Sequence, residues 1–121
     1  MSAMLQICSM PRVPSAFIDI GEYRVYSSTS ATFRALSAVE EIFERATSIN
    51  EALEDLLASV SYVAERRPTA ILLFNAMRRI VNSLYTAIKG GASKAEASNV
   101  VSEQVNSIKR EIELAFSLTA A

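Results

Sequence analysis

Hydrophobic residues recur every three or four positions along most of this 121-residue chain, which is the spacing of one face of an α-helix. Four such stripes follow one another, at about 30–47, 50–67, 68–89 and 94–116. The third comprises Leu73, Met77, Ile80, Val81, Leu84 and Ile88. Amphipathic helices with short connections can bury their stripes only against one another. The pattern therefore predicts an all-α fold, a four-helix antiparallel-type bundle over residues 29–121.

Side chains that can cap a helix mark the starts of the first two stripes. Four serine or threonine residues at 27–30 precede the first stripe, and Asn50 precedes the second. Such side chains accept hydrogen bonds from the unpaired N–H groups of a first helical turn. Glu51 and Glu54 follow Asn50, where the helix dipole favours negative charge. We therefore expect Asn50 to be the N-cap of the second helix.

Proline and glycine bound the third stripe. Pro68 lacks the N–H group that a helix start leaves unpaired, so the third helix is predicted to begin at Pro68 or Thr69. Gly90 begins a glycine pair, which predicts the end of that helix. Ser93 and Glu96 have the spacing of a capping box, in which each side chain bonds the other's N–H group. A fourth helix is therefore expected to start there.

The N-terminal residues follow a different pattern. Two prolines predict an extended lead over residues 1–15, because proline pushes the preceding residue toward extended geometry. Gly21 lies between two β-prone runs, 17–20 and 23–26, which is typical of a short β-hairpin. An isolated hairpin is marginally stable, so we expect it to lean on the helices or on a second copy in a homodimer. Residues 1–28 are thus assigned to the lead and hairpin.

Composition narrows the classes of function. With a net charge of −1, the chain lacks the basic excess usual for proteins that bind nucleic acid or a membrane surface, so neither partner is expected. Cys8 is the sole cysteine, which excludes an internal disulfide and fits a cytoplasmic location. Without histidine, the usual nucleophile–base pairs and zinc sites are missing. We therefore expect no enzymatic activity, no metal and no cofactor.

Charge is unevenly distributed although its sum is small. Acidic residues predominate at 40–55 and basic residues at 65–94. Arg67, Arg78 and Lys89 are each eleven residues apart, close to three full turns, so the pattern predicts that they align along one flank of the third helix. Complementary charge of this kind is suited to a protein partner.

The strongest candidate site is the predicted N-terminus of the third helix. Unpaired N–H groups and the positive end of the dipole meet there, and Arg67 with the Thr69 hydroxyl would complete a clamp for a phosphate or carboxylate. Arg66 adjoins this corner, and Arg78 would extend it as a basic groove. Two alternatives stay open. Arg66 and Arg67 would instead cap the second helix and pair with Glu65, and Arg78 would belong to a solvated face.

The same stretch carries a family resemblance. Residues 67–78, R-P-T-A-I-L-L-F-N-A-M-R, resemble the R-P-T-A-x-x-L-F-x-A segment in the helical N-terminal domain of one family. That family unites the regulatory subunits of translation initiation factor 2B, ribose-1,5-bisphosphate isomerase and methylthioribose-1-phosphate isomerase. The likeness is closest to the archaeal ribose-1,5-bisphosphate isomerase branch and extends in helix pattern over about 29–116. In the isomerases, the arginine that matches Arg67 lies at the substrate phosphate pocket. Residues 27–30 stand where those enzymes carry an Arg-Gly-Ala loop, so their hydroxyls would bind a phosphate or cap the helix.

The resemblance also bears on catalysis. The catalytic cysteine and aspartate of those isomerases belong to a C-terminal domain that residues 1–121 do not match, and Cys8 lies outside the matching region. We therefore expect a non-catalytic interaction or regulatory module related to the initiation factor 2B subunits, with a protein partner such as an initiation factor 2 subunit. The alternative is an accessory domain that binds a sugar phosphate or nucleotide and completes an isomerase chain. A third hypothesis is self-association through the hairpin.

Overall fold

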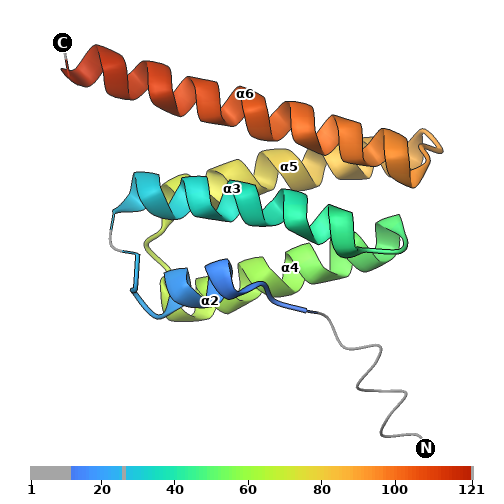
Figure 1. Ribbon diagram of the computed structural model, residues 1–121, viewed down its shortest axis with the longest axis horizontal. Helices are drawn as coiled ribbons and strands as arrows, with labels where there is room; N and C mark the ends of the chain where they lie inside the picture. Colours follow the sequence, from blue (N-terminus) through green and yellow to red (C-terminus); the bar gives the residue numbers. More distant parts are fainter. Residues whose placement is uncertain (1–11, 26, 121) are drawn as a thin grey trace, which may run out of the picture.

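The computed structural model describes residues 12–25 and 27–120, with side chains described as far as Ala115. Over these residues the fold consists of five helices and contains no strand (Figure 1). The helices are α2 (Ser15–Gly21), α3 (Ser28–Arg45), α4 (Ile49–Arg66), α5 (Ile71–Lys89) and α6 (Lys94–Ala120). The all-α prediction is confirmed for the described residues. Most of the predicted lead, residues 1–11, lies outside them.

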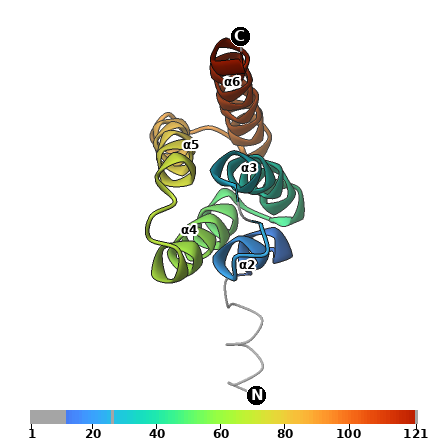
Figure 2. The ribbon, with the colours of Figure 1, turned by 90° about the vertical axis from the view of Figure 1, so that its left-hand side faces the viewer.

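Helix α3 occupies the centre of the molecule. It contacts α2, α4, α5 and α6, and Figure 2 shows α6 on one side of it and α2 with α4 on the other. Helix α5 bridges the two groups by packing against both α4 and α6. Every helix contributes fully buried side chains to one core: Phe17, Ile20, Leu36, Val39, Leu56, Val63, Leu73, Met77, Ile80, Leu84, Val101 and Val105.

The predicted stripe on α3 is confirmed, and its N-cap is a serine from the expected group. Ser27 Oγ accepts a hydrogen bond from the N–H group of Ser30 at 3.0 Å. The N-cap prediction for α4 is wrong, because Ser48 rather than Asn50 caps that helix. Ser48 Oγ accepts from the N–H group of Glu51 at 3.1 Å, and the Glu51 carboxylate accepts from the N–H group of Thr47 at 3.0 Å. These two hydrogen bonds fix the N-cap two residues earlier than predicted.

The start of α5 also differs from the prediction. The helix begins at Ile71, and Pro68 and Thr69 lie in a turn closed by a hydrogen bond from the N–H group of Ala70 to the Arg67 carbonyl at 3.2 Å. Arg67 has a φ of −140°, because the residue before a proline is disfavoured in helical geometry. Helix α4 therefore ends at Arg66, two residues before Pro68, and the turn must be completed before α5 can begin.

The C-terminal end of α5 and the start of α6 follow the predictions. Helix α5 stops at Gly90, and Gly91 has a φ of +77°, a left-handed conformation that favours glycine. Ser93 and Glu96 form the predicted capping box, since each side chain accepts from the other's N–H group at 3.2 and 3.1 Å. The capping bonds to Ser93 lower the pKa of Glu96 below its ordinary value of 4.5.

The predicted hairpin is wrong for the residues that the structure describes, because Ser15–Gly21 forms a helix; Tyr26 lies outside them. Phe17 and Ile20, three positions apart, share one helical face and are completely buried against the core. Gly21 serves close packing rather than a hairpin turn: a Cβ atom there would lie 2.6 Å from Cε1 of Tyr62 on α4. Burial of the apolar face of α2 thus outweighs the β propensity of the segment.

Candidate functional site

Arg67, the first of the predicted anion ligands, is part of the fold in this structure. It follows the last residue of α4 and is only 7% exposed. Its Nη1 donates hydrogen bonds to the carbonyl oxygens of Ile20 at 3.3 Å and Val25 at 2.5 Å, and its guanidinium carbon lies 4.6 Å from the centre of the Tyr23 ring. We call this group the Arg67 clasp. The charged hydrogen bonds join the end of α4 to α2, through Ile20, and to the segment that follows α2, through Val25.

The clasp constrains the backbone at Tyr23. This residue has a φ of +61°, a left-handed conformation that costs a side-chain-bearing residue about 1 to 2 kcal/mol. The conformation brings the Tyr23 ring to the guanidinium of Arg67, where a cation–π contact contributes roughly 0.5 to 1 kcal/mol. The turn after α2 is therefore shaped to enclose Arg67.

The other three predicted ligands do not join Arg67 at one site. Arg66 is exposed, lies 3.7 Å from the centre of the Tyr62 ring, and places Nη1 3.6 Å from the Glu65 carboxylate. Its Nη1 also donates to the Tyr62 carbonyl at 3.2 Å, so Arg66 follows the alternative in which it caps α4. Thr69 is exposed in the turn before α5, and Arg78 is exposed within α5.

Helix α5 exposes a stripe of apolar, polar and basic side chains to solvent. Ile71 is 61% exposed and Tyr85 is 44% exposed, although both are large hydrophobic residues. They share an outward stripe with polar residues at helical spacing, and we call this stripe the outer face of α5: Ile71, Asn75, Arg78, Asn82, Tyr85 and Lys89. Arg78 and Lys89 align on it as predicted, whereas Arg67 does not because it lies outside the helix.

Charge on this surface has one sign. Helix α5 contains three basic residues and no acidic residue. Arg79 points to the opposite flank, where its Nη1 lies 2.8 Å from the Glu111 carboxylate of α6. Arg78 and Lys89 form no hydrogen bond or ion pair with the residues that the structure describes. Two cations on the outer face of α5 are thus left for solvent or a partner.

A second apolar stripe on α4 adjoins the outer face of α5. Leu53, Leu57 and Val60 recur four and three residues apart, and Leu57 is 41% exposed. The other flank of α4 is taken by the α2 segment, since Asp55 accepts the Arg12 N–H at 2.8 Å and Tyr62 lies against Gly21. The Leu53 stripe therefore faces α5, which packs against α4.

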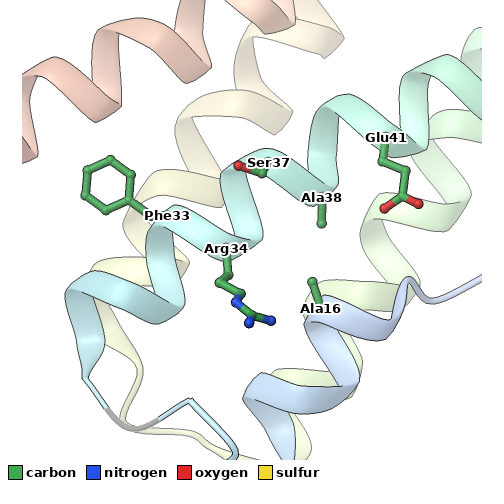
Figure 3. Close-up of a pocket in the computed structure, with 6 residues that line it drawn as sticks. All are labelled: Ala16, Phe33, Arg34, Ser37, Ala38 and Glu41. Carbon is green, nitrogen blue, oxygen red and sulfur yellow. The ribbon is translucent and has the colours of Figure 1, made fainter.

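A separate hollow of about 390 Å³ opens on the outer side of α3. Figure 3 shows Phe33, Arg34, Ser37, Ala38 and Glu41 of α3 with Ala16 of α2 around it. Arg34 Nη1 lies 3.8 Å from the Asp19 carboxylate at its edge. Arg34 and Glu41 carry opposite charges on one short stretch of helix, so the hollow has no net charge to select a ligand. The Ser37 hydroxyl in its lining accepts a hydrogen bond from Lys109 Nζ of α6 at 3.5 Å.

Comparison with known proteins identifies no relative of this chain. No protein-family model matches it, and neither a search of curated proteins nor a search of solved structures finds a match. Among the described residues, no cluster of three or more histidine, cysteine or carboxylate side chains is placed to hold a metal ion. No helix in that part of the chain has both the length and the apolar character needed to cross a membrane.

Sequence reasoning did not predict the exposure of the apolar side chains Leu57 and Ile71. The apolar spacing of residues 50–67 includes Leu57 in the stripe expected to be buried, and Ile71 lies outside the predicted stripe of the third helix. A signal was present, because Ile71 is an apolar residue seven positions before Arg78, on the same side of the helix as the charges. Apolar residues within a charged stripe indicate a surface that a partner covers.

Proposed function

We propose that this chain is a non-catalytic protein-interaction module, related to the helical N-terminal domain of the initiation factor 2B regulatory subunits. The resemblance of residues 67–78 supports the relationship. We further propose that α3, α4, α5 and α6 correspond to the helical bundle of that domain, and that the module acts in the cytoplasm. Its partner is a protein with an acidic surface.

The outer face of α5 is the observation that carries this proposal. It combines exposed apolar side chains, Ile71 and Tyr85, with two unpaired cations and lacks any acid. Aromatic, aliphatic and arginine side chains together are typical of the centre of a protein interface. The cations select a partner of opposite charge and speed its association.

The alternative of a sugar-phosphate or nucleotide accessory domain gains nothing from this geometry. That function needs the Arg67 guanidinium at an open corner, whereas Arg67 is buried and donates to the carbonyls of Ile20 and Val25. Thr69 and Arg78 are not brought to it. Self-association through a hairpin lacks its element, because residues 15–21 are helical.

A binding assay with a defined protein tests the proposal. The alpha subunit of initiation factor 2 is titrated into the purified chain in a calorimeter, since the resemblance implies this partner. We expect binding that the double variant Ile71→Ser/Arg78→Glu weakens by at least about ten-fold, because it removes an apolar contact and reverses a charge. No binding of the natural chain would remove the initiation-factor assignment.

A matched control distinguishes loss of contacts on the outer face of α5 from a general loss of folding. The double variant Leu114→Ser/Arg110→Glu makes the same chemical changes on α6, at residues that are also exposed. It should bind as the natural chain does, and circular dichroism should give both variants the same helix content. Equal loss of binding in both double variants contradicts a role for α5.

A further inference from the structure

Helices α4 and α5 pack against each other, and each carries a stripe of partly exposed side chains. We call the two stripes together the α4–α5 strip: Leu53, Leu57 and Val60 of α4 with Phe74, Arg78, Val81 and Tyr85 of α5. The α5 members recur at intervals of four, three and four residues, so they share one flank of the helix. The opposite flank of α5 pairs with α6 through Arg79 and Glu111, which leaves this flank toward α4.

The strip is apolar, long and incompletely covered. Leu53, Val60, Phe74 and Val81 are partly buried hydrophobic residues at the edge of the core, and Leu57 and Tyr85 are 41% and 44% exposed. From residue 74 to residue 85 the strip extends about 16 Å, given a rise of about 1.5 Å per residue. This length corresponds to about three turns of a helix laid along it. A helix with its own apolar stripe is the form of partner that such a surface accepts.

The single charge in the strip determines the chemistry of that partner. Arg78 lies near the middle of the α5 stripe and has no acidic neighbour on its own helix. A wholly apolar helix would bury its guanidinium without a counter-ion, and a basic helix would repel it. A carboxylate placed among the apolar side chains of the partner satisfies both requirements.

A second copy of this chain, joined with its α5 against α5, does not meet these requirements. A twofold pairing of α5 with α5 would bring together two helices that each carry three basic residues and no acidic residue. We infer that the α4–α5 strip binds an acidic amphipathic helix of a different protein. This inference rests on the proposed function and names the form and charge of the partner.

Helical peptides of defined composition test the inference. One labelled peptide of about 14 residues has leucine at i, i+3, i+4 and i+7 positions and glutamate elsewhere, and a second has lysine in place of glutamate. Fluorescence anisotropy should show the full chain binding the acidic peptide at least about ten-fold more tightly than the basic one. The chain has a net charge of −1, so this preference does not follow from its overall charge.

Matched substitutions locate the binding. Arg78→Glu should reverse the preference, whereas Arg110→Glu, the same change on α6, should keep it. Leu57→Ser should weaken binding of the acidic peptide by about ten-fold. Leu114→Ser, also at an exposed leucine, should leave the affinity unchanged. Equal affinity for both peptides, no binding, or equal effects of the paired variants would overturn the inference. So would self-association, measured by light scattering, that Arg78→Glu abolishes.

The two proposals can fail separately. If Ile71→Ser/Arg78→Glu abolishes binding of the protein partner but Leu57→Ser leaves it intact, the partner contacts α5 alone. The proposed function then stands and the helix along the α4–α5 strip is rejected. If neither variant affects the protein partner and neither peptide binds, both proposals are rejected.

Discussion

Arg67 and Arg78 are two arginines eleven positions apart, and one is buried while the other is exposed. Arg67 is buried in the clasp, where two carbonyl oxygens and an aromatic ring surround its guanidinium. Arg78 is exposed on α5, and its side chain forms no hydrogen bond or ion pair with a described residue. The difference teaches that a basic residue beside a helix start becomes a ligand site only if the rest of the chain leaves it uncovered.

The surroundings of the two arginines differ in the same way. Around Arg67 the segment from Arg12 to Val25 is fixed by the Asp55 carboxylate, by the close contact of Gly21 with Tyr62, and by the burial of Phe17. Apolar side chains on the same face of α5 as Arg78 remain exposed, Ile71 to 61% and Tyr85 to 44%. One region is closed by the chain itself, and the other is open to a partner.

The largest expected contrast is between a buried and an exposed apolar residue. Phe17→Ala should lower the free energy of unfolding by about 3 to 5 kcal/mol, because it removes a fully buried ring of α2 and leaves a cavity. Leu57→Ala should lower it by about 1 kcal/mol or less, since that side chain is largely solvated. Urea unfolding followed by circular dichroism measures both. Similar losses would break the contrast between closed and open regions.

The two arginines themselves provide the next contrast. Arg67→Ala should cost about 2 to 4 kcal/mol, because two carbonyl oxygens lose a charged donor inside the fold. Arg67→Lys should recover part of this, since an ammonium cannot reproduce the planar fork of a guanidinium. Arg78→Ala should change stability by no more than about 0.5 kcal/mol. A stable Arg67→Ala variant would show that the clasp contributes little.

Glycine substitutions sharpen the contrast at the level of close packing. Gly21→Ala should destabilise by about 1 kcal/mol, because the new Cβ would lie 2.6 Å from the Tyr62 ring and this outweighs the gain in helix propensity. Gly90→Ala should be neutral or stabilising, since its Cβ would meet no atom closer than 3.6 Å and its φ is −80°. Thermal melting distinguishes them. Tyr62→Ala should relieve the cost of Gly21→Ala.

The smallest expected effect is on how the free energy of unfolding depends on pH. The pKa of Glu51 lies below 4.5 because the Thr47 hydroxyl and N–H group bond its carboxylate, and bonds to Ser93 lower the pKa of Glu96 likewise. Their stabilising contribution is present above the unfolded value of 4.5 and is lost as pH falls through the lowered folded values. As pH is lowered from about 5 to 3, the free energy of unfolding should fall less steeply in the double variant Glu51→Gln/Glu96→Gln than in the natural chain. Glu103→Gln on exposed α6 serves as the control; an unchanged slope in the double variant would contradict the capping role.

The sequence was sufficient to predict the long helices for a physical reason. Helices α3 to α6 each bury one face, so apolar spacing records their packing directly, and Ser93 with Glu96 forms a local motif that needs no distant partner. Helix α2 has only seven residues, and two of them lie in the core. Two apolar positions are too few to show a helical period, so the β-prone side chains determine the prediction for this segment. Its helical state depends on burial against α3 and α4, which no local pattern reveals.

The candidate site was predictable only where it depends on one helix. The excess of basic residues on α5 can be read from the sequence, and Arg78 lies on an exposed face as the alternative interpretation held. The environment of Arg67 cannot be read in this way, because its acceptors are the carbonyls of Ile20 and Val25, 47 and 42 residues away. The exposure of Leu57 likewise depends on how α4 packs against its neighbours.

Amide chemical-shift mapping of the isotope-labelled chain, titrated with the acidic helical peptide, tests the central claim most directly. The account predicts shifts confined to residues 53–60 and 74–85, while the amides of residues 66–71 around the Arg67 clasp stay in place. Shifts centred on residues 66–71 would contradict it, because they would show that the anion site lies at the clasp and that the α4–α5 strip is an ordinary solvated surface.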